Sequence, residues 1–355
     1  MCQRHRNPLQ CILPPHVLDG IARNGTKKQR DFALRTLHVD TTLRAMRAAA
    51  TIAPAGAGLG STPGAPRRTV YDAHHAESTA GAALVRAEGG AAVADVAVNE
   101  AYDGLGATYG LYWDVYHRDS IDDSGLPLNA YVHYGASYDN AFWDGAEMVF
   151  GDGDGQLFNR FTVAVDVIGH ELTHGVTENE AQLQYLGQAG ALNESISDVF
   201  GSLVKQHALG QTADKADWLI GAGLLAPGVK GVALRSMSAP GTAYDDPVLG
   251  KDPQPDTMAK FVHTTADHGG VHINSGIPNR AFYLVASAIG GKAWDKAGEI
   301  WYETLRSPKL HPSAGFRAFA RLTVLTSARL YTAKGAETKA VVNAWKTVGI
   351  TVKQP

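Results

Sequence analysis

Cysteine is almost absent from this sequence of 355 residues, because the only two cysteines are Cys2 and Cys11, close to the N-terminus. Disulfide bonds therefore cannot crosslink the main part of the chain, and peptidase chemistry based on cysteine is excluded there. A protein of this size that works outside the cell without such bonds would normally rely on bound ions or on tight packing.

The sequence also lacks an excess of charge of one sign, and it lacks long apolar runs. The 32 basic and 35 acidic residues give a formal net charge of −3, which predicts no nucleic acid and no anionic membrane as a partner. No apolar run approaches the roughly 20 residues that a membrane-spanning helix needs. The first residues, Met1 to Pro15, also lack the pattern of an ordinary secretory signal.

The composition separates two short N-terminal parts from the rest. Residues 1–50 form a small segment that is basic and compatible with helix from Asp31 to Arg47. Residues 51–68 continue a stretch of Ala, Gly, Pro, Thr and Ser that begins at Ala48, and such a linker cannot bury a core. We expect this linker to contain the site of proteolytic processing.

The remaining chain divides into a β-rich part and a helical part. In residues 69–165, runs such as Tyr109 to Tyr116 and Tyr131 to Tyr134 alternate with Gly and Asp turns, which indicates sheet with some helix. In residues 166–355, apolar residues recur at helical spacing. The predicted fold class is α+β, with two domains and a cleft between them.

The pattern His170-Glu171-Leu172-Thr173-His174 is the strongest chemical signal in the sequence. Histidines at i and i+4 project from one face of a helix, so both can reach a single metal ion. By itself the pattern is also compatible with two structural histidines on a helix.

A third ligand is available twenty residues further on, at Glu194. Two histidines and one carboxylate leave a fourth zinc position open for water, as a catalytic site requires. Asp198 lies on the same helix face as Glu194 and is placed to accept the second ring N–H of His170. The alternative for Glu194 alone is a solvated helix carboxylate.

At this point the sequence resembles the thermolysin-like metallopeptidases, from about Thr69 to Ile350. Besides the two motifs above, the resemblance rests on four further segments in the family's order: Tyr138 to Gly145, Gly151 to Gly155, Leu234 to Met237 and Gly269 to Gly276. It implies a zinc endopeptidase with a thermolysin-like two-domain fold.

The resemblance also implies the roles of the catalytic residues. One zinc ion would be bound by His170, His174 and Glu194, with Asn193 and Asp198 beside them. Glu171 would be the general base that deprotonates the zinc-bound water and passes the proton to the leaving amine. His272 and Tyr185 would stabilise the carbonyl oxygen as it becomes negative, and Asp267 would orient His272.

Substrate contacts follow from the same resemblance. Asn140 and the carbonyl of Ala141 match the edge segment that binds an extended peptide, and Arg235 matches the donor to the carbonyl just after the scissile bond. The pocket for the residue after the cut would be apolar, which predicts bulky hydrophobic side chains there; its lining would be Phe158, Phe161, Val167 and Leu234.

The run Gly151 to Gly155 lacks the Glu of an EF-hand and the Lys of a phosphate loop, so we interpret it as a tight turn.

A departure from the family pattern concerns the double calcium site, where Lys205 stands at a carboxylate position. We expect its ammonium to pair with Asp166 and Asp217 in place of calcium. Otherwise Lys205 is an ordinary solvated helix residue.

The N-terminal segment resembles the short prosegments of the protealysin-like branch, through the run Cys11 to His16. The Pro14-Pro15 pair is expected to hold a stiff extended strand in the cleft and to block substrate. The Cys11 thiolate could occupy the open zinc position. Its alternative role is that of a small buried apolar residue.

The predicted protein is therefore the precursor of a zinc endopeptidase that cuts peptides and proteins before bulky hydrophobic residues. Its partners would be these substrates, its own prosegment and a proteinaceous inhibitor. The family resemblance implies that the protein is secreted, here by a route without an ordinary signal peptide. The alternative location is the cytoplasm. The competing functions are another zinc enzyme with the same helix motif and a peptidase-like binding module without catalysis.

Overall fold

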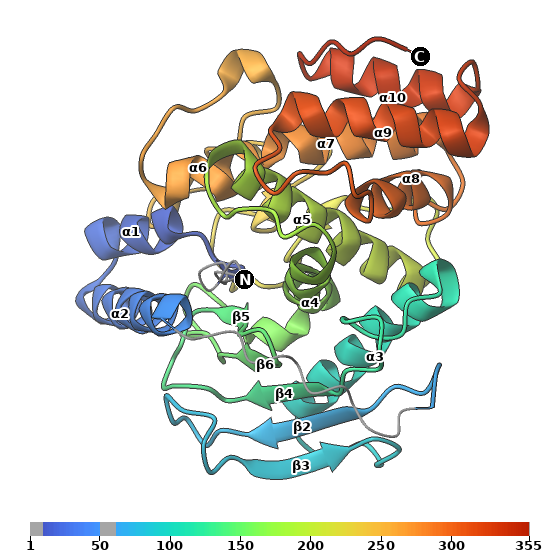
Figure 1. Ribbon diagram of the computed structural model, residues 1–355. Helices are drawn as coiled ribbons and strands as arrows, with labels where there is room; N and C mark the ends of the chain where they lie inside the picture. The colour runs from blue at the N-terminus through green and yellow to red at the C-terminus, as the bar shows by residue number, and fades with distance from the viewer. Residues whose placement is uncertain (1–9, 50–61, 355) are drawn as a thin grey trace.

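The computed structural model describes residues 10–49 and 62–354 (Figure 1). Cys2 and most of the predicted linker lie outside these residues. In the described part of the chain, no helix is long and apolar enough to cross a membrane.

A mixed sheet of six strands forms the β-rich half, in the order β1-β5-β6-β4-β2-β3. The strands from residue 62 onward are β2 (Arg68–Asp72), β3 (Ala83–Ala87), β4 (Leu128–Val132), β5 (Ala141–Trp143) and β6 (Glu147–Phe150). Strand β4 runs parallel to both β2 and β6, whereas β5 is antiparallel to β6. The outermost strand, β1 (Gln10–Cys11), comes from the N-terminal segment and pairs antiparallel with β5.

Helix α3 (Val96–Tyr116) corrects one sequence prediction, because Tyr109 to Tyr116 belong to it and not to a strand. The carboxylate of Asp95 caps the helix by accepting the backbone N–H groups of Ala97 and Val98. The tyrosines recur on a buried helical face, where Tyr112 stacks on Phe200. The aromatic enrichment of this run indicated a strand, but the packing of its tyrosines in the core stabilises a helix.

The C-terminal half is helical, as predicted. Its helices are α4 (Val165–Glu180), α5 (Gly187–Leu209), α6 (Asp267–Asn274), α7 (Gly276–Ile289), α8 (Lys296–Leu305), α9 (Phe316–Tyr331) and α10 (Ala336–Thr347). Two-residue strands β7 (Leu219–Ile220) and β8 (Arg235–Ser236) pair between α5 and α6, as do β9 (Asp245–Asp246) and β10 (Gly250–Lys251).

Helices α4 and α5 pack against each other so closely that their contact requires glycine. A Cβ atom on Gly201 would lie 2.4 Å from the backbone oxygen of Asp166, and one on Gly169 would lie 3.0 Å from the Cβ of Val204. These glycines bring the two helix backbones together next to His170. The metal-binding motif on α4 therefore faces the third candidate ligand on α5.

The N-terminal segment folds into a pair of helices, α1 (Pro15–Asn24) and α2 (Lys27–Ala49). In Figure 1 the pair lies beside α6 and the β5 edge of the sheet, at the junction of the two halves. Pro15 begins α1, where a proline needs no backbone N–H. The predicted extended conformation of the Pro14-Pro15 pair thus holds for Pro14, with φ −66° and ψ 145°, but not for Pro15, which belongs to α1.

Candidate active site

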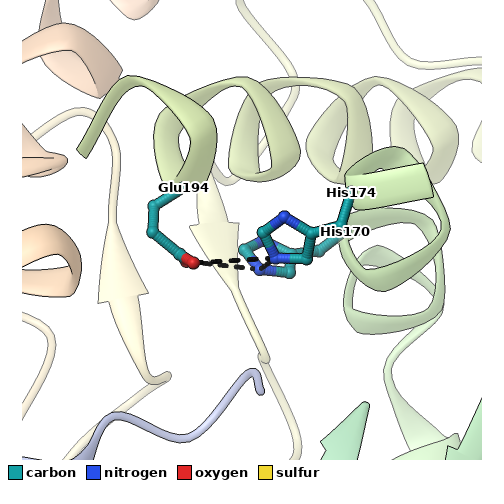
Figure 2. Close-up of side chains that lie close together, drawn as sticks. All are labelled: His170, His174 and Glu194. Atoms are coloured by element: carbon teal, nitrogen blue, oxygen red, sulfur yellow. Dashed lines mark hydrogen bonds and ion pairs between the residues drawn. The ribbon is translucent and has the colours of Figure 1, made fainter. Parts of the chain in front are cut away.

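Three buried side chains form a candidate metal centre, as Figure 2 shows. One ligand atom each from His170, His174 and Glu194 lies within 4.8 Å of the others. The Nε2 atoms of the two histidines are 3.1 Å apart, and they lie 3.5 Å and 3.6 Å from the Glu194 carboxylate. Helix α4 supplies the histidines one turn apart, and α5 presents Glu194 to them.

The outer nitrogens of both imidazoles are occupied by partners that orient the rings. Asp198 accepts a hydrogen bond from Nδ1 of His170 at 2.8 Å. Asn193 Oδ1 lies 2.9 Å from Nδ1 of His174, at the same distance as the Ser197 hydroxyl. The Nε2 atoms are therefore left to face the centre, which is the arrangement of metal-ligating histidines.

The residues present fit a zinc ion. Within the described part of the chain, Glu194 Oε2 and Glu171 Oε1 are buried oxygens without a hydrogen-bond partner, and such atoms are costly unless an ion or water satisfies them. Burial lowers the pKa of His174 to about 3, which keeps this imidazole in the neutral, metal-binding form.

Glu171 on α4 lies beside this centre and contacts strand β5. Its Oε2 accepts the backbone N–H of Trp143 at 3.2 Å, and burial raises the pKa of its carboxyl to about 8. A divalent cation next to it would favour the ionised form and lower this pKa.

A second group of residues approaches from the opposite wall. His272 Nδ1 lies 2.6 Å from the carboxylate of Asp267, and its Nε2 lies 3.2 Å from the Tyr185 hydroxyl. Burial lowers the pKa of His272, but the charges of Asp267 and Glu194 outweigh it and the net shift is upward. The Tyr185 hydroxyl in turn donates to Glu194. Nε2 of His272 is thus available as a donor towards the cleft.

The turn in front of His272 depends on Gly269 and Gly270. Their φ angles are 86° and 76°, in the left-handed region where other residues are strained. This turn folds Asp267 back onto His272, whose backbone N–H also donates to Asp267 at 2.8 Å.

The N-terminal segment lies in the cleft as an extended peptide. Its residues pair with β5 in the register Gln10 to Trp143 and Cys11 to Phe142. Beyond this pairing, the Ile12 N–H donates to the Ala141 carbonyl at 3.3 Å. The segment thus extends the sheet at the edge predicted to receive substrate.

Two predicted substrate-binding side chains contact this peptide as well. The Leu13 N–H donates to Asn140 Oδ1 at 3.0 Å, and Arg235 Nη1 donates to the Ile12 carbonyl at 3.1 Å. Nε2 of His272 lies 3.2 Å from the Cys11 carbonyl oxygen.

The predicted pocket residues belong to the main apolar core of the protein, which also contains Ile12 and Leu13. All four are buried, and the rings of Phe158 and Phe161 lie 6.0 Å apart. The turn that precedes them has the predicted tight form, because Asp154 accepts three successive backbone N–H groups and Gly153 and Gly155 have positive φ. The four predicted pocket residues are Phe158, Phe161, Val167 and Leu234.

The side chain of Cys11 lies away from the metal centre, in a separate apolar cluster with Tyr138, Phe142 and Val39. Burial raises the pKa of its thiol well above the usual value, which disfavours the thiolate that binds zinc. Within the described residues the metal-binding group contains no cysteine. The structure therefore favours the buried apolar role over the zinc ligand.

Lys205 lies where the sequence predicted it. Its Nζ atom is 3.1 Å from Asp166 and 2.7 Å from Asp217. Asp166 is buried and also accepts the backbone N–H of Gly221. Two carboxylates thus converge on one ammonium group.

Several contacts were not foreseen from the sequence. Asp198 also accepts hydrogen bonds from Arg235 and Asn279, so the residue that orients His170 orients a substrate-binding side chain too. Asp40 on α2 is buried and binds the Tyr138 hydroxyl and the Asn140 amide. An acidic residue within a basic helix was the only signal of Asp40 in the sequence.

Comparison with known proteins agrees with this geometry. Residues 62–178 match the catalytic domain of the thermolysin metallopeptidases, and residues 181–350 match their α-helical domain. An extracellular metalloprotease of Pectobacterium carotovorum subsp. carotovorum is 52% identical over 98% of both chains. The chain belongs to the thermolysin metallopeptidase family. It is therefore a metalloprotease with the thermolysin-like α+β fold predicted from its sequence.

Two further similarities place the protein within that family. The precursor of protealysin from Serratia proteamaculans is 54% identical and superposes with a TM-score of 0.88, covering 96% of this chain and 100% of that one. Protease PrtS of Photorhabdus sp. is 48% identical over 99% of this chain and 95% of its own. The metallopeptidase is thus protealysin-like and has the form of a precursor.

Proposed function

We propose that this metallopeptidase is a zinc-dependent neutral endopeptidase that cuts on the N-terminal side of bulky hydrophobic residues. The observation that supports it is an extended peptide that pairs with β5 and whose Cys11 carbonyl lies 3.2 Å from His272 Nε2, which is itself 3.6 Å from Glu194 of the candidate metal centre. Residues 1–50 are the inhibitory prosegment, 51–68 the linker with the processing site, and 69–165 and 166–355 the two peptidase domains.

A zinc ion bound by the three ligands would lower the pKa of water towards about 7 and polarise the scissile carbonyl. Glu171 takes a proton from the attacking water and returns it to the nitrogen of the leaving amine. Nε2 of His272 and the Tyr185 hydroxyl donate to the carbonyl oxygen as its negative charge grows. Asp267 holds the His272 imidazole in the donating orientation.

Substrate is held by backbone pairing and by two side chains. The Ala141 carbonyl and Asn140 Oδ1 accept successive N–H groups, and Arg235 donates to the carbonyl between them, as each does for the N-terminal segment. This three-point contact fixes the peptide in one register. The bond to be cut lies next to Glu171 and His272.

Hydrolysis of an internally quenched peptide with a central Gly-Leu bond tests this function. The processed protein is expected to cut the Gly-Leu bond, to lose activity in a zinc chelator and to recover it when zinc is returned. Processed protein that binds zinc but cuts no peptide would instead support a peptidase-like binding module. Activity unaffected by removal of the metal would contradict the mechanism.

The apolar pocket makes a separate prediction about specificity. Leu234→Asp places a charge at the wall of the pocket and is expected to lower cleavage before Leu or Phe by roughly 10- to 100-fold, since burying such a side chain is worth about 1.5–3 kcal/mol. Leu234→Met keeps the volume and is the matched control. Cleavage-site profiles of a peptide library report the result, and a profile unchanged by Leu234→Asp would place the pocket elsewhere.

The environment and partners of the enzyme complete the proposal. Relatives from Pectobacterium carotovorum and Serratia marcescens are named extracellular, which supports secretion of this protease, by a route that does not use an ordinary signal peptide. Besides peptide and protein substrates and its own prosegment, we include a proteinaceous inhibitor as a partner. Lys205 takes the place of calcium at the family's double site.

A further inference from the structure

The path of the prosegment identifies one of its own peptide bonds as the bond in the cutting position. Arg235 binds the carbonyl just after a scissile bond under the proposed function, and here that carbonyl belongs to Ile12. The residue on the other side is Cys11, whose carbonyl oxygen faces His272 Nε2 at 3.2 Å. The peptide bond between the two contacts is Cys11–Ile12.

We propose that the processed enzyme hydrolyses its own prosegment at the Cys11–Ile12 bond, an inference that rests on the proposed function. The prosegment is then a substrate held in the productive direction. Its antiparallel pairing with β5 continues from Gln10 through Cys11 to the Ile12 N–H without a change of register.

The side chain after the bond matches the proposed specificity. Ile12 is fully buried and belongs to the main apolar core of the protein, which also contains the four residues of the proposed pocket. A branched aliphatic residue of this size is the kind of group that an apolar pocket accepts. Cys11, before the bond, is also fully buried, so both sides of the bond are enclosed by protein.

The reaction is an ordinary hydrolysis and needs no further reactant. The oxygen of one water molecule bonds to the Cys11 carbonyl carbon, and the bond from that carbon to the Ile12 nitrogen breaks. Glu171 carries one proton of the water to the Ile12 nitrogen. The products are a carboxylate at Cys11 and an amine at Ile12, and no atom is oxidised or reduced.

Contacts beyond the cleft explain how the prosegment blocks the site before it is cut. Arg47 at the end of α2 donates to the Trp143 carbonyl at 2.8 Å and to Glu178 at 2.8 Å, and Asp40 holds the Asn140 amide at 2.9 Å. While the linker is intact, these contacts and the peptide strand hold the segment at the site together. Once Cys11–Ile12 is cut, Gln10 and Cys11 are no longer joined to the helices, so the segment that begins at Ile12 loses its pairing with Trp143 and Phe142. The cut therefore weakens the binding of the prosegment to the site.

Mass spectrometry with N-terminal sequencing of the zinc-loaded precursor during processing tests the proposal. A fragment that begins at Ile12 is expected from the wild type and not from Glu171→Ala. Ile12→Leu, a matched variant, is expected to give the fragment beginning at position 12, whereas Ile12→Asp is expected to reduce it at least tenfold.

The quenched Gly-Leu peptide, assayed in the same samples, separates the two proposals. Wild-type enzyme that cuts this peptide but leaves Cys11–Ile12 intact in all recovered prosegment overturns the self-cleavage alone. Loss of both reactions overturns the proposed function and the self-cleavage with it. A fragment beginning at Ile12 that forms equally from Glu171→Ala assigns the cut to another protease and also overturns the inference.

Discussion

Replacing Glu171 by alanine is expected to lower kcat/KM for the quenched peptide by roughly 10²- to 10⁴-fold, the usual contribution of a positioned general acid–base group. Glu171 is the buried carboxylate next to the candidate metal ligands on α4, and it accepts the backbone N–H of Trp143 on β5. Without it, the attacking water keeps its proton and the leaving amine receives none.

The comparison is valid only at equal zinc content, because the substitution lies next to His170. Metal analysis of both processed proteins supplies this check. Glu303→Ala removes a partly exposed carboxylate on α8, paired with Arg329 and Arg306, and is expected to leave the activity unchanged. Activity of Glu171→Ala within threefold of the wild type would remove Glu171 from the mechanism.

Replacing Lys205 by alanine is expected to reduce the free energy of unfolding by about 3–5 kcal/mol at most, the cost of leaving one charge of a buried pair without its partner. The effect arises at Asp166, which is 1% exposed, and much less at Asp217, whose side chain is 43% exposed. Burial already raises the pKa of Asp166, and the nearby ammonium opposes this shift. Thermal unfolding measures the loss, in a Glu171→Ala background that prevents self-digestion.

Lys215→Ala is the matched control, because the Lys215–Asp214 pair is exposed on both sides, and such pairs contribute little. A calcium-selective chelator is expected to leave the Tm of the protein with Lys205 intact unchanged. A large fall in that Tm would show that calcium, and not Lys205, neutralises the two carboxylates.

The prosegment and a substrate would use the same contacts, and this has a consequence for interpreting variants. Asn140 and Arg235 hold the prosegment in the structure and are proposed to hold substrate after processing. Substitutions at these positions therefore weaken inhibition of the precursor and catalysis by the mature enzyme together. Under the proposed boundaries, substitutions at Asp40 or Arg47 would concern only the precursor, since both residues would leave with the prosegment.

The zinc-binding motif and the helical half were predictable from the sequence because their signals are local. A helix places residues i and i+4 on one face whatever surrounds it, so His170 and His174 could be paired without a structure. Helical spacing of apolar residues likewise predicted that residues 166–355 are mainly helical. Local composition failed at Tyr109 to Tyr116, where the buried face of α3 is aromatic.

The amino-acid sequence by itself indicated the family, the candidate ligand set and the pairing of Lys205, and it proposed Glu171 as the general base, through residue types at fixed separations along the chain. Only the tertiary structure decided what the prosegment does in the cleft, because the partners of Cys11 and Ile12 are more than a hundred residues away. In the structure, the Cys11 thiol lies in an apolar cluster, and the Cys11 carbonyl faces His272. Contacts at such separations depend on how the helices and the sheet edge pack, and no local pattern in the chain encodes that packing.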